Sequence, residues 1–419
     1  MDSTAGKLIA TALRTVYQGF GITPAAVAAD AGITIQNLEE IAAGKPLGNQ
    51  ETDRLLRTLR LAKEPHSAGL YETPTDDEPV RMLTLRREFI ELDEESRLRV
   101  FQLSQDARNL ESLQYSLSQS SSWERFIEAR DKLDLPRPDA TLLPWQQGEK
   151  LAIALRRTLN LGNQPVASMR NLVKNHFPGL TLLDGLLGHN GPEGILFADK
   201  SRGVTVVLNQ AIPKNRLPWV RRFNLAHELG HALTDIGLRR PMAHVSRHMS
   251  DSQFEVEQRA NAFAAYFLCP RNVLLDFVDQ FQDSRKAVEH VVVNYGLPYT
   301  TVRTILKNVA NLEVPPQPAS ELDLDRWQQM ESEPSLEEFP LNQIPMEYRS
   351  NMARMATELF LLASITRDQY AWTLGLDSDS SVVIELPRLL FGPGCPAVLF
   401  SELREILVAN NIEIDFSRT

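Results

Sequence analysis

The most constraining feature of this sequence is the stretch from Arg221 to Leu233, which contains the pattern His-Glu-x-x-His. Its apolar residues recur at roughly helical spacing, so the stretch is predicted to be a helix. His227 and His231 are four residues apart and share one helical face, where both imidazoles can reach a single metal ion. Glu228 points about 100° round the helix, which suits a general base acting on a water molecule beside the metal.

The pattern alone leaves open an amphipathic helix with two polar histidines at its edge, because a catalytic zinc site needs a third protein ligand. A second helix, rich in Ala and aromatic residues, is predicted from Phe254 up to Pro270, which stops it. Glu257 is the best candidate for the third ligand, since Asn261 lies on the same face and can hold a ligand histidine. Glu255 is the alternative ligand, and Glu257 could instead be a solvated first-turn charge favoured by the helix dipole.

Two other sources of a third ligand fit less well. The metzincin pattern needs a histidine six residues after His231, and that position is Gly237. His244 and His248 form a second pair at i, i+4 spacing, but no Glu lies between them. The Pro, Met and Ser residues around this pair favour an ordinary loop.

Two motifs, at a characteristic separation, carry a family resemblance: Arg222-Phe223-x-x-Ala226-His227-Glu228-x-Gly230-His231 and Glu257-x-x-Ala260-Asn261-x-Phe263-Ala264-x-x-x-Leu268-x-Pro270. Together they resemble the ImmA/IrrE family of zinc-dependent endopeptidases over roughly residues 146–310. The resemblance implies that His227, His231 and Glu257 bind Zn²⁺ and that Glu228 is the catalytic base. It also implies a protein substrate, a helix-turn-helix transcriptional repressor cleaved in a stress, phage-defence or mobile-element response.

Some details of this site stay open. Cys269 stands where the family usually has Met, and it is either an ordinary buried cysteine or an inhibitory or redox-sensitive ligand. Tyr266, His244 and His248 are weak candidates for stabilising the oxyanion. Manganese and cobalt can occupy the same ligands as zinc.

Composition limits the class of protein. A chain of 419 residues is long for one domain, so about two to four domains are expected. Its 43% hydrophobic content, without an apolar run of about 18 residues or a signal peptide at Met1, predicts a soluble protein with no membrane partner. Two cysteines, Cys269 and Cys395, fit a reducing cytoplasm better than a disulfide framework. The net charge of −10 argues against broad, charge-driven nucleic-acid binding.

Residues 1–64 are predicted to be a helix-turn-helix domain. Helices over 23–30 and 35–42 flank a turn that contains Gly32, and another helix covers 49–61. The arrangement resembles the Cro/C1-type (XRE) domain.

That resemblance implies DNA binding through Gln36, Asn37 and Lys45, and a protein-contact module is the alternative. Glu39 and Glu40 lie on the expected recognition helix, where DNA phosphates would repel them.

The fold class expected for the whole chain is α+β, mostly helical, with a zincin-like peptidase domain. Its small sheet is predicted from strands over 180–183, 194–198 and 203–209, just before the metal helix. An edge strand of such a sheet can pair with a peptide substrate. The predicted order after residue 64 is a linker 65–79, a helical spacer 80–144, the peptidase domain 145–312, a linker 313–320 and a C-terminal domain 321–419.

The role of several segments is open. The spacer could also cover the peptidase or form a hairpin that makes a homodimer. The C-terminal α+β domain, with helices over 347–364, 367–374 and 400–409 and a strand over 382–386, is a regulatory candidate on position alone. The basic residues before the metal helix could contact an acidic substrate or nucleic acid, but a solvated face is favoured: Lys214, Arg216, Arg221 and Arg222.

The two competing functions are an enzyme and a binding module. The first is a zinc endopeptidase with Glu228 as base. The second is an XRE-type regulator or antitoxin whose peptidase fold serves sensing or assembly. The Glu next to the first ligand histidine favours the enzyme, because a site without catalysis has no need of a base there.

Overall fold

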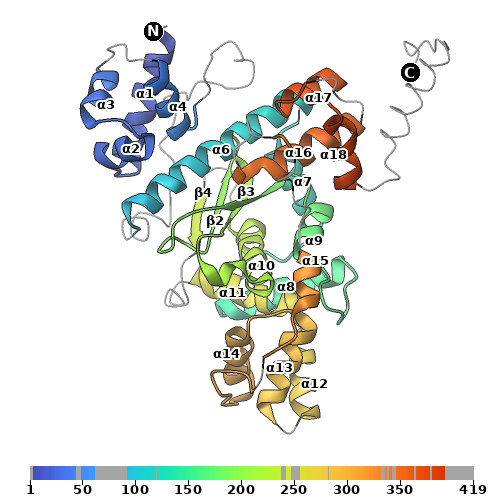
Figure 1. Ribbon diagram of the computed structural model, residues 1–419. Helices are drawn as coiled ribbons and strands as arrows, with labels where there is room; N and C mark the ends of the chain where they lie inside the picture. The colour runs from blue at the N-terminus through green and yellow to red at the C-terminus, as the bar shows by residue number, and fades with distance from the viewer. Residues whose placement is uncertain are drawn as a thin grey trace, which may run out of the picture. The chain divides into compact units, whose positions relative to one another are not determined.

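A computed structural model describes most of the chain, and the described residues fall into two compact units (Figure 1). The first unit comprises Met1–Leu113 and Ser120–Ser332, and the second comprises Gln114–Gln119 and Glu333–Thr419. The described residues are 3–43, 49–61, 92–118, 120–236, 242–246, 255–281, 283–319, 321–331, 336, 339–341, 346–362, 365–377 and 380–391. Among these residues, no helix is both long and apolar enough to cross a membrane.

The N-terminal residues form short helices: α1 (Ser3–Arg14), the π-helix η1 (Thr15–Gly19), α2 (Pro24–Ala31), α3 (Ile35–Ala42) and α4 (Asn49–Thr58). Thr23 and Thr34 cap α2 and α3, each accepting a hydrogen bond from a backbone N–H three residues later. Gly32 ends α2 with a φ of 62°, a value that glycine adopts without strain. The predicted helix, turn and helix over 23–42 are confirmed, while the assignment to the Cro/C1 type stays a prediction.

A long helix, α6 (Glu94–Ser118), is buried on most sides, although its sequence is polar. Phe101 meets Phe20 edge-to-face with ring centroids 5.2 Å apart. Gln102 donates to the Asp30 carboxylate at 3.0 Å and to the Thr58 carbonyl at 2.9 Å. These bonds satisfy polar groups that would otherwise be costly to bury. After α6 comes α7 (Ser122–Asp131), so two helices lie within the predicted spacer, while residues 132–143 at its end are not helical.

The sheet has four strands: β1 (Leu180–Gly185), β2 (Gly194–Asp199), β3 (Gly203–Asn209) and β4 (Met242–Ser246). Their order is β1-β3-β2-β4, with β1 parallel to β3 and the other pairs antiparallel. The three predicted strands are confirmed. The loop expected around His244 is wrong, because His244 pairs with Leu196 of β2. A strand of five residues that pairs with one neighbouring strand is too short to show a clear alternation of apolar and polar residues in the sequence.

The register shows that the sheet is covered on both faces. Gly185 is paired with Asn209 on one face, and an added Cβ there would meet Leu103 of α6. Gly194 is paired with Leu208 on the other face, where an added Cβ would meet Glu228. Paired residues point to the same side and successive residues to opposite sides. The sheet therefore lies between α6 and the helix that carries the His-Glu-x-x-His pattern.

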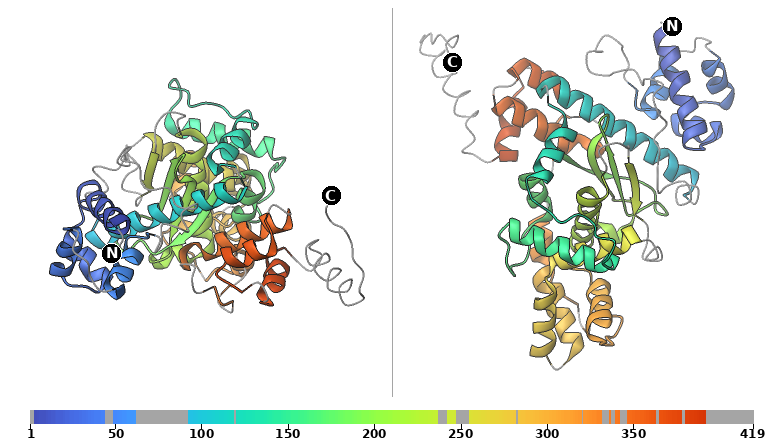
Figure 2. Two further views of the ribbon diagram at one scale, coloured as in Figure 1. Left: turned by 90° about the horizontal axis from the view of Figure 1, so that it is seen from above. Right: turned by 180° about the vertical axis from the view of Figure 1, so that it is seen from behind.

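The remaining helices of the first unit build the body around that pattern: α8 (Pro144–Thr158), α9 (Met169–His176), the 3-10 helix η2 (Pro213–Arg216), α10 (Pro218–Thr234), α11 (Glu255–Leu268), α12 (Arg271–Gln280), α13 (Ser284–Tyr295) and α14 (Tyr299–Ala310). The apolar face of α10 packs into a continuous core through Leu225 and Leu229, with Phe263 and Phe267 of α11. Helices α12, α13 and α14 lie at the end of the unit away from α6 (Figure 2).

A short helix, α15 (Asp325–Glu331), belongs to the first unit and holds α10 in place. Glu331 forms an ion pair with Arg222 at 2.6 Å and accepts hydrogen bonds from the Ser168 hydroxyl and the Met169 N–H at the start of α9. Trp327 stacks on the Arg222 guanidinium at 4.1 Å. Arg222 is 1% exposed, so the expectation of a solvated face is wrong for this residue.

The described part of the second unit is helical, with α16 (Met346–Leu361), α17 (Arg367–Thr373) and α18 (Val382–Phe391). The predicted strand over 382–386 is wrong, since these residues begin α18, and the described residues of this unit contain no strand. Val382, Val383 and Leu386 are buried while Glu385 is exposed, which is a helical spacing. A short apolar run does not separate strand from helix by itself. The predicted helix over 400–409 lies outside the described residues.

Candidate metal centre

Three predicted ligands meet at one point between α10 and α11. The Nε2 atoms of His227 and His231 are 3.0 Å apart. Glu257 places Oε2 3.2 Å from Nε2 of His227 and Oε1 3.4 Å from Nε2 of His231. All three residues are buried, and their ligand atoms lie within 4.8 Å of one another. The structure thus brings together residues that lie on two helices and are up to 30 positions apart (257 − 227) in the sequence.

The donor set fits a zinc ion. Tetrahedral zinc binds nitrogen and oxygen ligands at about 2.0–2.2 Å, which places neighbouring ligand atoms roughly 3.3 Å apart. The separations here, 3.0, 3.2 and 3.4 Å, surround that value. Two imidazoles and one carboxylate leave a fourth position for water or substrate, as in catalytic zinc sites.

Hydrogen bonds on the far side of each imidazole turn the ligand nitrogens inward. Nδ1 of His227 lies 3.1 Å from Oδ1 of Asn261, and Nδ1 of His231 lies 2.8 Å from Oδ2 of Asp235. When Nδ1–H donates to these oxygens, Nε2 carries the lone pair that binds a metal. Asn261 lies where the sequence predicts it. Asp235 was missed, although its i, i+4 spacing from His231 on a helix is a signal for such a contact.

The charge at this point favours a cation. Burial alone lowers the pKa of His231, but hydrogen bonds to Asp235 and Glu257 outweigh it and raise the pKa to about 10. A shift in this direction means that the surroundings stabilise positive charge. A divalent metal ion supplies the same charge when it binds.

Glu228 is buried without a hydrogen-bond partner among the described residues. Its side chain is fully buried, and both carboxylate oxygens lack a partner there. The start of β2 lies directly against it, since a Cβ added to Gly194 would lie 2.6 Å from Oε1. Burying a carboxylate in this way costs free energy, so packing alone gives no reason for an acid here.

The other predicted ligands do not join this group. Glu255 is exposed at the start of α11. The side chains of His244 and His248 lie outside the described residues. Cys269 is twelve residues after Glu257, which is about 18 Å along a helix, and burial raises the pKa of its thiol. The interpretation of Cys269 as an ordinary buried cysteine therefore fits its position.

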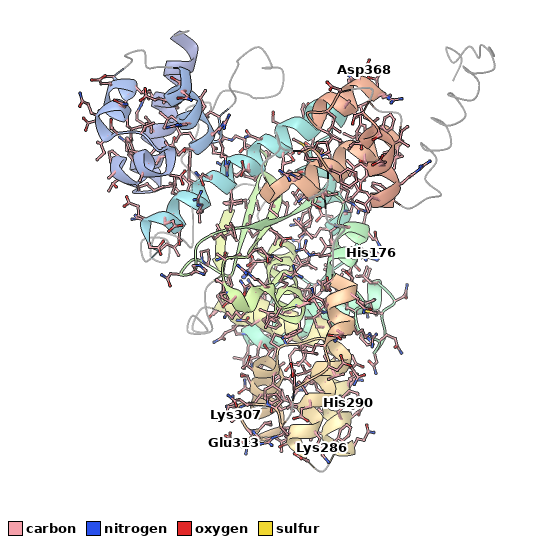
Figure 3. All side chains as sticks on the ribbon, in the orientation of Figure 1. His176, Lys286, His290, Lys307, Glu313 and Asp368 are labelled. Carbon is pink, nitrogen blue, oxygen red and sulfur yellow. The ribbon has the colours of Figure 1, made fainter. Side chains whose placement is uncertain are left out.

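Tyr266 also lies away from the ligands. It is nine residues after Glu257, or about 14 Å along α11, and half a turn round the helix. Burial and the nearby charge of Glu149 raise its pKa to about 12. Tyr266 is therefore not placed to stabilise an oxyanion. His176 and His290, labelled in Figure 3, are not members of the group of described residues that could hold a metal.

The predicted DNA-contacting residues are partly engaged by acidic neighbours. The Asn37 amide donates to Glu51 at 2.6 Å, and the Gln36 amide donates to Glu40 at 3.4 Å. Lys45 lies outside the described residues. An amide that bonds a carboxylate is less available for a base edge, and the carboxylate repels phosphate.

Comparison with known families places this site in context. Residues 205–306 match the family model of the IrrE N-terminal-like domain, Peptidase M78. The comparison with curated proteins found no match. The matched range starts within β3 and includes all of α10 and α11, hence the three convergent ligands and Glu228. Residues 205–306 are therefore similar to an IrrE-type peptidase domain.

Proposed function

We propose that the chain is a zinc-dependent endopeptidase in which His227, His231 and Glu257 hold the metal and Glu228 is the general base. One observation carries this proposal: a fully buried carboxylate without a described partner stands next to three convergent ligands. A purely structural metal site has no need of that carboxylate.

The chemistry divides between the metal and the protein. When bound, Zn²⁺ would polarise the scissile carbonyl group and lower the pKa of a water molecule. Glu228 accepts the proton of the attacking water and then donates it to the leaving amine. Asn261 and Asp235 hold the two ligand histidines in the orientation that keeps Nε2 toward the metal.

The sheet supports a protein as the substrate. Strand β4 is at the edge of the sheet, beside β2, whose first residue contacts Glu228. An edge strand can offer backbone N–H and C=O groups to an extended peptide. The IrrE-type domain and the ImmA/IrrE resemblance support a helix-turn-helix transcriptional repressor as that protein. Cleavage would then take part in a cytoplasmic stress, phage-defence or mobile-element response.

A DNA-binding regulator or antitoxin is the second candidate. The helix, turn and helix over 23–42 favour it, and a homodimer would suit a two-fold operator. The hydrogen bonds of Gln36 and Asn37 to glutamates weigh against it. Under this alternative, loss of Glu228 would leave the biological activity unchanged.

The direct test compares Glu228→Gln with the wild type, both loaded with zinc. The substrates are a panel of purified helix-turn-helix repressors and a library of short peptides. We expect cleavage to fall by about 10²- to 10⁴-fold, because the proton acceptor is gone while the three ligands remain.

Glu255→Gln is the matched control, since Glu255 is an exposed glutamate next to the site and should retain full activity. The proposal would be contradicted if Glu228→Gln cleaved substrates as fast as the wild type. It would also be contradicted if the wild type cleaved none of the repressors and none of the peptides.

A further inference from the structure

Behind the metal ligands, a buried ion pair joins the end of α10 to α11. Asp235 follows α10, and its two carboxylate oxygens are used differently. Oδ2 accepts from Nδ1–H of His231 at 2.8 Å, while Oδ1 pairs with the Arg259 guanidinium. The side chains of Asp235 and Arg259 are 14% and 10% exposed. The carboxylate is therefore held from both sides, and its plane is fixed relative to the imidazole.

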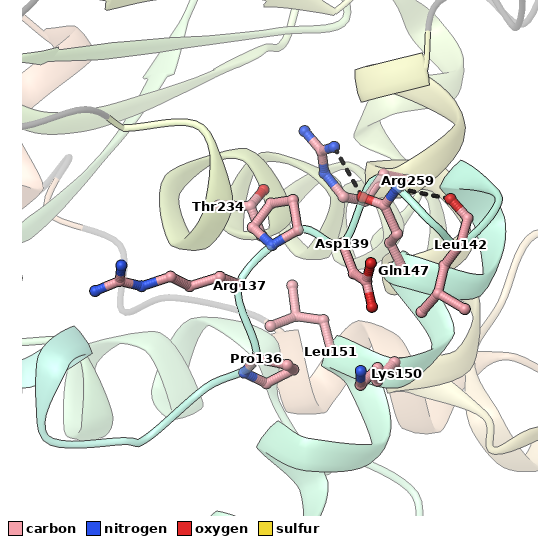
Figure 4. A pocket seen from close by; sticks show the side chains of 10 residues that line it. Pro136, Arg137, Asp139, Leu142, Gln147, Lys150, Leu151, Thr234 and Arg259 are labelled. Atoms are coloured by element: carbon pink, nitrogen blue, oxygen red, sulfur yellow. Dashed lines mark hydrogen bonds between the residues drawn. The ribbon is translucent and has the colours of Figure 1, made fainter.

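Arg259 is itself held by a contact on the side away from the metal ligands. Its Nη1 lies 3.4 Å from Oε1 of Gln147 on α8, and the Gln147 amide donates to the Leu142 carbonyl at 2.9 Å (Figure 4). Arg259, Gln147 and Thr234 are among the residues that line a small pocket. The backbone of α11 at Arg259 is close to α8, because a Cβ added to Gly148 would collide with the Arg259 carbonyl oxygen.

We infer that Arg259 is a positioning residue for the metal centre: it fixes the carboxylate of Asp235, which fixes the ring of His231. This inference rests on the proposed zinc site. Loss of the Arg259 guanidinium would remove a group that fixes the rotation of the Asp235 carboxylate, and the imidazole would then be less well oriented. A guanidinium is suited to this task, because its donors lie in a rigid plane.

The measurement is the zinc affinity of the full chain, by competition between the apoprotein and a chromophoric chelator. We expect Arg259→Met and Asp235→Ala each to bind zinc about 10- to 100-fold more weakly than the wild type. The double variant should bind no more weakly than Asp235→Ala alone, because Arg259 acts through Asp235. Arg259→Lys should recover part of the loss, since an ammonium group can still donate to Asp235.

Arg271→Met is the matched control. Arg271 also pairs with a carboxylate, that of Glu149 at 3.4 Å, but touches no ligand, so zinc affinity should not change. Circular dichroism of each apoprotein separates loss of affinity from loss of fold, and Arg259→Lys provides the milder change if Arg259→Met fails to fold. The inference is overturned if zinc affinity is unchanged in the Arg259 variants or if the losses are additive with Asp235→Ala. A wild type that binds no zinc would instead overturn the proposed function itself.

Discussion

Two buried glutamates show how the same residue type serves different ends. Glu331 is 3% exposed, and its charge is balanced by Arg222 and by N–H donors at the start of α9. Glu228 is equally buried but has no hydrogen-bond partner among the described residues. Burying a carboxylate without hydrogen-bond partners lowers the stability of a folded protein by about several kcal/mol. Glu331 thus stabilises the packing, whereas the burial of Glu228 without such partners is what the proposed role as general base would require.

At this scale, Gly194→Ala tests the placement of Glu228. The new Cβ would lie 2.6 Å from Oε1, closer than a carbon and an oxygen can approach, so the carboxylate must move. We expect cleavage to fall by about 10²-fold, as for a catalytic group displaced by about 1 Å, while zinc content stays that of the wild type.

Gly185→Ala is the control, because its Cβ would meet Leu103 instead of the site. It should lower stability without a selective loss of cleavage. Full activity of Gly194→Ala would show that Glu228 does not act from the position seen here.

At the scale of elements, the local sequence pattern was enough to predict α10, α11 and the first three strands. The i, i+4 spacing of His227 and His231 and the alternation before them are properties of short sequence windows. The sequence did not predict strand β4 and helices α15 and α18, because contacts with distant parts of the chain stabilise them. Glu331, for example, bonds residues more than 100 positions away in the sequence. The sequence around Glu331 gives no indication of such a distant partner.

The short helix α15 gives a prediction of its own. Glu331→Ala leaves Arg222 buried without its counter-charge, so we expect the free energy of unfolding to fall by about 3–5 kcal/mol. Denaturant unfolding of the full chain measures this change. Replacing both partners, as Glu331→Leu with Arg222→Met, should cost less than Glu331→Ala. Equal stability of Glu331→Ala and the wild type would contradict the role given to this ion pair.

At the scale of the whole molecule, the proposed metal centre occupies a small part of a long chain. The convergence of His227, His231 and Glu257 could be expected from the sequence, because a shared metal ion requires fixed spacings on two helices. The Asp235–Arg259 pair and the burial of Arg222 depend on how these helices pack, which spacing does not reveal. The roles of residues 1–64 and 321–419 remain predictions, since composition and helix positions leave their partners unspecified.

Metal content tests most directly whether His227, His231 and Glu257 form one zinc site. Purified wild type should carry about one zinc per chain, as expected for a single three-ligand catalytic site. His227→Ala and Glu257→Ala should both lose it, and Glu255→Ala should keep it. A wild type without metal after zinc is supplied, or full zinc content in Glu257→Ala, would contradict the site described here.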